Sequence, residues 1–244
     1  MELVKKIFSY FSKGAVQPER GYDLWAAAYD SQPGNLMLAL DEQVFSTLLR
    51  DTAIDGKAIV DVGCGTGRHW PKLFAEGPGS ITGYDVSAGM LQVLKDKFPA
   101  AVVHKLEDER LQQTAEASTD IVVSTLTVAH IKNIGKALSE WNRVVKPGGY
   151  ILITDYHPGA LERGGRRTFR HGDKTVAIEN NIHTIGQMTG YAKQLGWRLL
   201  RLEERKIDES VRHFYEEQSA LALYESFKGV SIIYGLLFEK NADQ

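Results

Sequence analysis

The chain has 244 residues, of which 43% are hydrophobic and 25% are charged, and its formal net charge is −2. The charge is too balanced for nucleic-acid binding over the whole surface, and the single cysteine, Cys64, excludes an intrachain disulfide and a cysteine-based zinc site. No apolar run approaches the ~20 residues of a membrane span, and no signal-peptide pattern opens the chain. We therefore expect one large α/β domain in a cytoplasmic enzyme without a membrane span.

The first 51 residues should form a helical cap. Met1 to Lys13 places apolar residues at helical spacing among three lysines. This fits a membrane-surface helix or, because the segment is short, better a helix that folds back over the domain. Tyr22 to Asp30 combines aromatic and acidic residues with three alanines, and Leu36 to Asp51 has the apolar spacing of a helix that leads to the first strand.

Three glycines at every second position, Gly63, Gly65 and Gly67, follow an apolar run that ends in an acid. This pattern predicts a buried strand, a tight turn and a helix N-terminus, where backbone N–H groups approach an anionic or polar ligand. A Cβ atom at these positions would block the turn and the approach of the ligand. The dinucleotide fingerprint G-x-G-x-x-G does not fit, because Arg68 occupies the place of its third glycine.

Two carboxylates stand at the ends of the first two predicted strands. Asp85 lies eighteen residues past Gly67, where a carboxylate can accept hydrogen bonds from both ribose hydroxyls of an adenosine. Asp61, close to the glycine turn, suits a ligand with a cationic amino group and would repel a pyrophosphate.

Strands and helices alternate through the central part of the chain, which indicates a doubly wound parallel sheet with right-handed crossovers. We expect strands near 58–62, 80–85, 101–105, 120–125 and 149–155, with helices near 68–75, 87–97 and 133–144. The pattern breaks at His157, and the insertion up to Ile182 should contain a hairpin near Gly172. Beyond it we expect helices over 184–195 and 214–227 and strands over 197–207 and 230–239.

These segments resemble the motifs of class I S-adenosylmethionine-dependent methyltransferases of the small-molecule type, similar to the ubiquinone/menaquinone biosynthesis group. The resemblance covers about residues 20 to 157 and includes Val60–Arg68, Tyr84–Leu91, Asp120–Ser124 and Val144–Gly149. It implies a seven-stranded, mostly parallel Rossmann-like sheet whose last strand is antiparallel. It also implies a single domain over 1–244, with the cofactor-binding core at 52–157 and the substrate-side insertions and final strands at 158–244.

The resemblance implies S-adenosylmethionine as cofactor and S-adenosylhomocysteine as product. Asp85 would hold the ribose, and Val86 and Met90 would pack against the adenine. Lys105-Leu106 departs from the family's acid–apolar pair, because lysine cannot accept a hydrogen bond from the adenine amino group, and Glu107 or Asp108 would take that part. The complete set of implied cofactor residues is Tyr22, Tyr29, Asp61, Gly63, Gly65, Thr66, Gly67, Arg68, Asp85, Val86, Met90, Leu106, Glu107, Ser124 and Thr125.

Methyl transfer needs a general base only where the accepting atom must lose a proton. His157, after the fifth strand, is the candidate base. His130 resembles a family position near the cofactor, and a structural role fits it equally well. No spacing of histidines and acids indicates a metal site.

Five cations between Arg163 and Lys174 either solvate a loop or recognise an anionic acceptor. We interpret the chain as a methyltransferase that acts on a small molecule, because the insertions at 157–186 and 208–228 can roof a compact pocket. The alternatives are a tRNA-base or protein methyltransferase, a NAD(P)-dependent oxidoreductase and a non-catalytic binder of an adenosyl ligand. The substrate, the accepting atom and the oligomeric state are not readable from the sequence.

Overall fold

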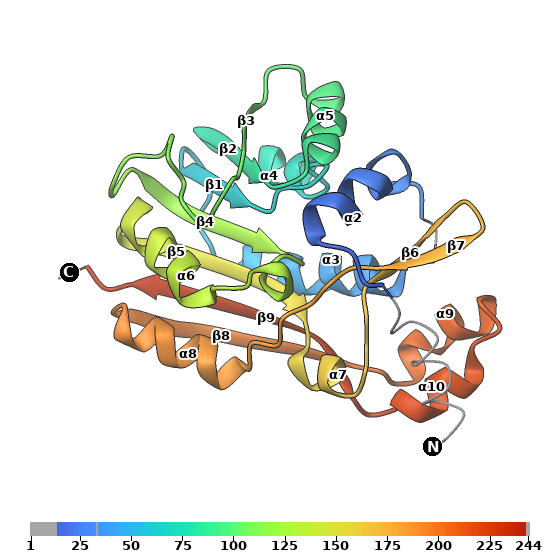
Figure 1. The fold of residues 1–244 in the computed structure, drawn as a ribbon. Coiled ribbons are helices and arrows are strands. Elements are labelled where there is room, and N and C mark those ends of the chain that lie inside the picture. Colours follow the sequence, from blue (N-terminus) through green and yellow to red (C-terminus); the bar gives the residue numbers. More distant parts are fainter. Residues whose placement is uncertain (1–13, 33, 243–244) are drawn as a thin grey trace.

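The computed structural model describes residues 14–32 and 34–242, so the helix expected over Met1 to Lys13 lies outside the described residues. A seven-stranded sheet in the order β3-β2-β1-β4-β5-β9-β8 forms its centre (Figure 1). The strands are β1 (Ala58–Val62), β2 (Ser80–Asp85), β3 (Val102–Lys105), β4 (Thr119–Thr125), β5 (Val145–Tyr156), β8 (Trp197–Lys206) and β9 (Ser231–Lys240).

The sheet has the predicted topology. Strands β1 to β5 pair in parallel, and β9 lies between β5 and β8 and is antiparallel to both. The strand order reverses between β1 and β4, so the crossovers leave these two strands in opposite directions and open a crevice at their carboxyl ends. The doubly wound, mostly parallel sheet with an antiparallel last strand is thereby confirmed.

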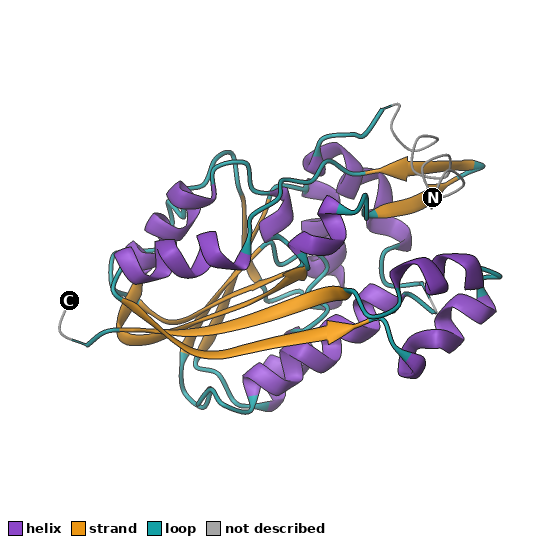
Figure 2. Cartoon of the chain, turned by 90° about the horizontal axis from the view of Figure 1, so that it is seen from below, coloured by secondary structure: helices purple, strands orange, loops and turns teal. Residues whose placement is uncertain are grey.

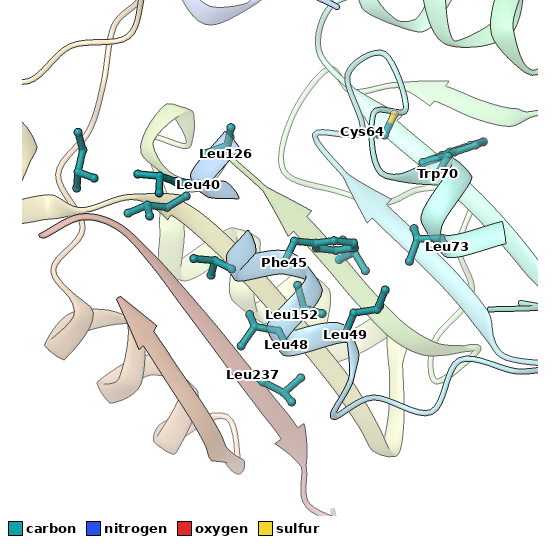
Figure 3. Packing of buried hydrophobic residues seen from close by; sticks show 14 of the residues in the cluster. Leu40, Phe45, Leu48, Leu49, Cys64, Trp70, Leu73, Leu126, Leu152 and Leu237 are labelled. Atoms are coloured by element: carbon teal, nitrogen blue, oxygen red, sulfur yellow. The ribbon is translucent and has the colours of Figure 1, made fainter. Parts of the chain in front are cut away.

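Helices cover both faces of the sheet (Figure 2). Neighbouring residues of one strand belong to different apolar clusters, as Ile59 and Val60 do, because successive side chains point to opposite faces. On the first face Phe45 and Leu48 pack against Leu152 of β5 and Leu237 of β9 (Figure 3). That face carries α3 (Leu36–Leu49), α4 (Trp70–Ala75) and α5 (Ala88–Lys97), and the opposite face carries α6 (Ile134–Val144) and α8 (Ile185–Gln194).

The remaining elements gather beyond the carboxyl ends of the parallel strands (Figure 1). A bridge between Val16 and Ile178 joins the start of the described chain to the segment after the predicted hairpin. These elements are α2 (Pro18–Trp25), η1 (Ala26–Ala28), η2 (Val128–His130), α7 (Pro158–Glu162), β6 (Thr168–His171), β7 (Lys174–Ala177), η3 (Glu209–Val211), α9 (Arg212–Glu217) and α10 (Leu221–Phe227).

Three boundaries differ from the prediction. Helix α4 begins at Trp70 and not at Arg68, because the glycine turn continues to His69. Strand β5 begins at Val145, where an irregular register lets it pair with Thr119 before the turn at Gly148. The helix expected over 214–227 is two short helices, since Ser219 between them has the left-handed φ of 53°.

Two separate constraints act on the glycine turn, backbone conformation and close packing. Gly63, Gly65 and Gly67 all have positive φ, at 74°, 52° and 69°. A Cβ atom on Gly63 would lie 2.0 Å from Thr127 Oγ1, and one on Gly67 would lie 3.1 Å from Leu94. A Cβ atom on Gly65 would meet nothing within 4 Å. Backbone conformation therefore favours glycine at all three positions, and close packing requires it at Gly63.

This difference predicts unequal effects of two matched substitutions. Gly65→Ala should lower the free energy of unfolding by about 1 kcal/mol, the cost of a left-handed alanine. Gly63→Ala should cost about 2–4 kcal/mol, because the strain is joined by a clash with Thr127 that a rotamer change alone does not relieve. Urea unfolding of both variants measures the two values, and equal losses would show that packing against Thr127 is unimportant.

Candidate functional site

Backbone hydrogen bonds hold the glycine turn at the carboxyl edge of the sheet. The N–H groups of Gly63 and Cys64 donate to the carbonyl oxygen of Tyr84, at 2.7 and 3.0 Å. The turn is thereby fixed beside the end of β2, next to the crevice between β1 and β4. The sequence places its first two predicted ligand groups, Asp61 and Asp85, on either side of it.

Asp85 ends β2, and its side chain is nearly enclosed, at 7% exposure. Its Oδ2 accepts from the Gly65 N–H and its Oδ1 from the Ser87 N–H, both at 2.8 Å. Burial raises the pKa of this carboxyl to about 6, although the two backbone hydrogen bonds act in the opposite direction. Each oxygen keeps one lone-pair direction for a ligand, because a carboxylate oxygen can accept two hydrogen bonds.

Asp61 in β1 is also buried, at 4% exposure. Its Oδ2 accepts from Trp70 Nε1 at 2.8 Å, whereas its Oδ1 has no hydrogen-bond partner in the described part of the chain. Burial raises the pKa of Asp61 to about 6. An unpartnered, buried carboxylate oxygen is costly unless a ligand supplies its donor.

A cavity of about 400 Å³ lies beyond the carboxyl ends of β1, β2 and β4. Acidic side chains predominate among its charged lining residues: Glu19, Asp85, Glu107, Asp108 and Glu109 face one lysine, Lys132. The sequence-predicted cofactor residues that line it are Tyr22, Gly63, Asp85, Val86, Leu106 and Glu107.

Lys105 stands apart from this lining, because its ammonium group pairs with Glu19 at 2.7 Å. The residues that follow it, Leu106, Glu107 and Asp108, border the cavity. Two carboxylates are therefore present at the place where the sequence required a replacement for the missing acid.

The other predicted cofactor residues build the surroundings of this cavity. Met90 packs beneath Trp25, and the backbone N–H of Gly65 donates to Asp85. The Ser124 hydroxyl donates to the Val62 carbonyl at 2.9 Å and is fully buried. The Thr66 hydroxyl donates to Asp30, and the Thr125 carbonyl accepts from Thr127. Arg68 pairs with Asp41, and Gly67 packs against α5. Tyr29 borders a second cavity.

This second cavity, of about 760 Å³, adjoins the first, and Leu126 borders both. The two insertions that the sequence predicted as a roof, 157–186 and 208–228, contribute to its walls, together with Trp25, Tyr29 and the start of α3. Trp25 stacks on Phe169 at a centroid distance of 4.7 Å and joins α2 to the β6–β7 hairpin. The polar lining of this second cavity includes Arg166, Arg167 and Arg170.

The two cavities meet at a hydrogen bond. Arg167 Nη1, on the side of the 760 Å³ cavity, donates to the Tyr22 hydroxyl on the side of the 400 Å³ cavity, at 2.6 Å, and also to the Leu126 carbonyl. Leu126 itself has a φ of 53°, a strained value for a residue other than glycine. The partition between the cavities is therefore made of Tyr22, Arg167 and Leu126.

A buried polar chain supports this partition. His130 Nδ1 lies 2.9 Å from the Glu179 carbonyl, which assigns its proton to Nδ1 and leaves Nε2 to accept from the Tyr22 hydroxyl at 2.9 Å. Burial and the nearby Arg167 lower the pKa of His130 to about 3, so the imidazole is neutral. Asp155 Oδ1 lies 3.5 Å from Arg167 and balances its charge.

Sequence reasoning missed this arrangement. It treated Arg167 like the other cations between Arg163 and Lys174, which either solvate a loop or recognise an anionic acceptor, whereas the Arg167 side chain is only 9% exposed and is hydrogen-bonded to Tyr22. Tyr22 and Arg167 are 145 positions apart, and no local pattern connects them. A buried arginine within a basic run has no signature in sequence alone.

His157 occupies a structural position at the start of α7. Its Nδ1 accepts from the Gly159 N–H at 3.1 Å, and its Nε2 lies 2.8 Å from Glu204 Oε1. It is absent from the lining of both cavities. The proposed role of His157 as a general base is a prediction that these contacts do not support.

The described residues contain no group of three or more histidine, cysteine, aspartate or glutamate side chains arranged to hold a metal ion. Within the same residues, no helix has the length and apolar character that crossing a membrane requires.

Comparison with known proteins agrees with this geometry. Residues 60–153 match the family described as "Methyltransferase domain". An uncharacterised methyltransferase of Emericella nidulans is 29% identical, over 89% of this chain and 88% of its own. A malonyl-[acyl-carrier protein] O-methyltransferase of Serratia marcescens is 32% identical, but the match spans 57% of this chain and about half, 52%, of that relative.

A solved structure, the S-adenosylmethionine-dependent methyltransferase of Mesorhizobium loti, superposes with a TM-score of 0.62 over 80% of this chain and 95% of its own. At 16% identity this likeness concerns the fold. The matching domain, the relatives and the sheet topology lead to one conclusion. The chain contains a methyltransferase domain over residues 60–153, and its sheet has the topology of the class I S-adenosylmethionine-dependent methyltransferases.

Proposed function

We propose that this protein binds S-adenosylmethionine in the 400 Å³ cavity and transfers its methyl group to a small-molecule acceptor in the 760 Å³ cavity. The observation that carries the proposal is that the two cavities are neighbours, separated only by the partition of Tyr22, Arg167 and Leu126. Methyl transfer from a sulfonium is an in-line displacement, so donor and acceptor must meet at such a boundary. A volume of 760 Å³ is in the range of small-molecule sites.

The charges of the first cavity support a cationic cofactor. S-adenosylmethionine carries a sulfonium and an ammonium group against one carboxylate, whereas NAD carries a pyrophosphate. Of the five acids of the lining, Glu19 pairs with Lys105 and Asp108 pairs with Arg110. Asp85, Glu107 and Glu109 attract the cationic cofactor and repel a pyrophosphate. This argues against the oxidoreductase alternative.

Individual residues support a definite placement of the cofactor. The open lone pairs of Asp85 suit the two ribose hydroxyls. Asp61 does not itself line the cavity, but it directly precedes the lining residues Val62 and Gly63, and its unpartnered Oδ1 suits the cofactor's ammonium group. Glu107 or Asp108 would accept from the adenine amino group, with Val86 and Leu106 against the ring faces. When bound, the cofactor supplies the reactive methyl carbon, and the protein's part is to hold and align both partners.

The arginines of the second cavity support an anionic acceptor. Relatives of this chain are named for different acceptors, one for malonyl-[acyl-carrier protein] and another for demethylmenaquinone. The fold therefore leaves the acceptor open, and the lining of the cavity is the better guide.

Calorimetric titration tests the cofactor. S-adenosylmethionine and S-adenosylhomocysteine should bind, and NAD and NADP should bind much more weakly, because of the acidic lining and the glycine turn that lacks the third fingerprint glycine. NAD binding as tight as that of S-adenosylhomocysteine would contradict the proposal. Tight binding without methyl transfer to any acceptor would favour a non-catalytic binder.

Asp85→Ala should weaken S-adenosylhomocysteine binding by about 1.5–3 kcal/mol, because two charge-assisted hydrogen bonds to the ribose are lost. The matched control is Asp96→Ala, which removes an exposed carboxylate from the neighbouring helix α5 and should bind normally. Calorimetry of both variants, with melting curves to verify folding, measures the effect. Equal affinities in the two variants would mean that Asp85 does not contact the ribose.

Asp61→Asn should stabilise the cofactor-free protein at pH 7.5 and weaken cofactor binding. The pKa of Asp61 is raised from 3.8 to about 6, so its stabilising contribution is complete below pH 3.8 and is lost as the pH rises through 6. The ionised form costs up to about 3 kcal/mol, which asparagine avoids. The gain in Tm should therefore be largest at pH 7.5 and small at pH 4.5.

The control for this variant should change the Tm in the opposite direction. Asp120 accepts from the Ala58 N–H and pairs with Lys146, both at 2.9 Å, and its pKa is lowered, although burial alone would raise it. Asp120→Asn should lower the Tm at pH 7.5. If both asparagine variants are destabilised to the same extent, the buried charge of Asp61 is not the source of strain.

A further inference from the structure

The lining of the 760 Å³ cavity has an unusual composition. In the described part of the chain, none of its lining residues is an aspartate, glutamate, histidine, lysine or cysteine. Its charged side chains are Arg166, Arg167 and Arg170. Arg167 is committed to Tyr22, Leu126 and Asp155, whereas Arg166 and Arg170 are exposed and make no ion pair with any described residue. Two cations are therefore available to a ligand.

The cavity consequently lacks a group that could take a proton near neutral pH. Burial raises the pKa of Tyr29 and of Tyr215, and it raises the pKa of Tyr156 to about 12, so all three phenols stay protonated and are poor bases. His130 lies behind the partition, and both of its ring nitrogens are already hydrogen-bonded, to the Tyr22 hydroxyl and to the Glu179 carbonyl. Asp155 is 1% exposed and accepts from the N–H groups of Ala129 and Tyr156.

The absence of a base restricts the acceptor. A hydroxyl or an ammonium group must lose a proton to be methylated, and an ammonium group would also be repelled by the arginines. A carboxylic acid, with a pKa of about 4, is already ionised at neutral pH and needs no base. Its oxygen can attack the methyl carbon directly, and the carbon–sulfur bond breaks with its electron pair passing to sulfur. The anion and the sulfonium yield a neutral ester and a neutral thioether, and no proton moves.

We propose that the acceptor is the carboxylate of a small molecule with an apolar body, that the product is its methyl ester, and that Arg166 and Arg170 draw the anion into the cavity. This inference rests on the proposed methyl transfer. Trp25, Phe169, Phe214, Leu223 and Ile232 supply the apolar wall that suits the body of the molecule.

The decisive experiment identifies the bond that carries the transferred methyl group. The protein is incubated with S-[methyl-³H]adenosylmethionine and a deproteinised extract of the source organism's cells, and in parallel with 3-phenylpropanoate and octanoate. The corresponding alcohols and amines serve as controls. Mild alkali hydrolyses methyl esters to volatile [³H]methanol, whereas ethers, thioethers and N-methyl groups are stable.

Label that becomes volatile in alkali is the expected result. Alkali-stable label, from the extract or from an alcohol or amine, overturns the carboxylate assignment and leaves the methyltransferase function intact. No labelled product from any acceptor contradicts the proposed function itself, and the carboxylate assignment with it. The two failures are therefore distinguishable.

A matched pair of double variants tests the arginines. Arg166→Gln with Arg170→Gln removes two charges from the cavity lining, and Arg163→Gln with Lys174→Gln removes two from the same insertion outside that lining. With the carboxylate acceptor the first pair should raise KM about tenfold, the loss of a charge-assisted hydrogen bond, and should change kcat little. The second pair should behave as the unmodified protein. Equal KM values in both pairs would rule out anion recognition by Arg166 and Arg170.

Discussion

One buried carboxylate connects the parts of this molecule that must stay in register. Asp41 of α3 is fully enclosed and pairs with Arg68, while His69 Nε2 lies 2.8 Å from its Oδ2 and the Thr154 hydroxyl donates to its Oδ1. Burial alone would raise its pKa, but the hydrogen bond from His69 and the charge of Arg68 hold the pKa well below its usual range. Removing a single partner would leave a buried charge uncompensated, at a cost of about 3–5 kcal/mol.

The position of this carboxylate relates the two cavities to each other. Arg68 and His69 are the last residues of the glycine turn beside the 400 Å³ cavity, and Thr154 lies near the end of β5. One turn before Asp41, the first residues of α3, Leu36 to Leu38, line the 760 Å³ cavity. The same helix thus fixes the turn and forms a wall of that cavity, so a displacement on one side cannot remain local.

Local patterns sufficed for the sheet and for the contact between the glycine turn and Asp85. The alternation of apolar runs and turns predicted every strand of the seven, because each depends on its own residues and on a short turn beside it. Asp85 and the glycines belong to one strand–helix–strand unit, in which the Gly65 N–H donates to Asp85. The Tyr22–Arg167 contact and the environment of Asp41 depend on tertiary packing between distant segments, and sequence patterns carry no information on them. The buried hydroxyl of Ser124 is a further example, because strand alternation does not reveal that this hydroxyl donates to a backbone carbonyl.

Cys64 gives the glycine turn a built-in chemical reporter. It is the only cysteine of the chain, and its thiol is buried between the backbone of the turn and β2. Burial raises its pKa well above the ordinary value, so the reactive thiolate is scarce while the turn is closed. Alkylation of the native protein must then proceed through openings of the turn, so the rate of alkylation reports how often the turn opens. The natural sequence therefore permits the motion of the turn to be followed by mass spectrometry, without the introduction of a label or the removal of competing thiols.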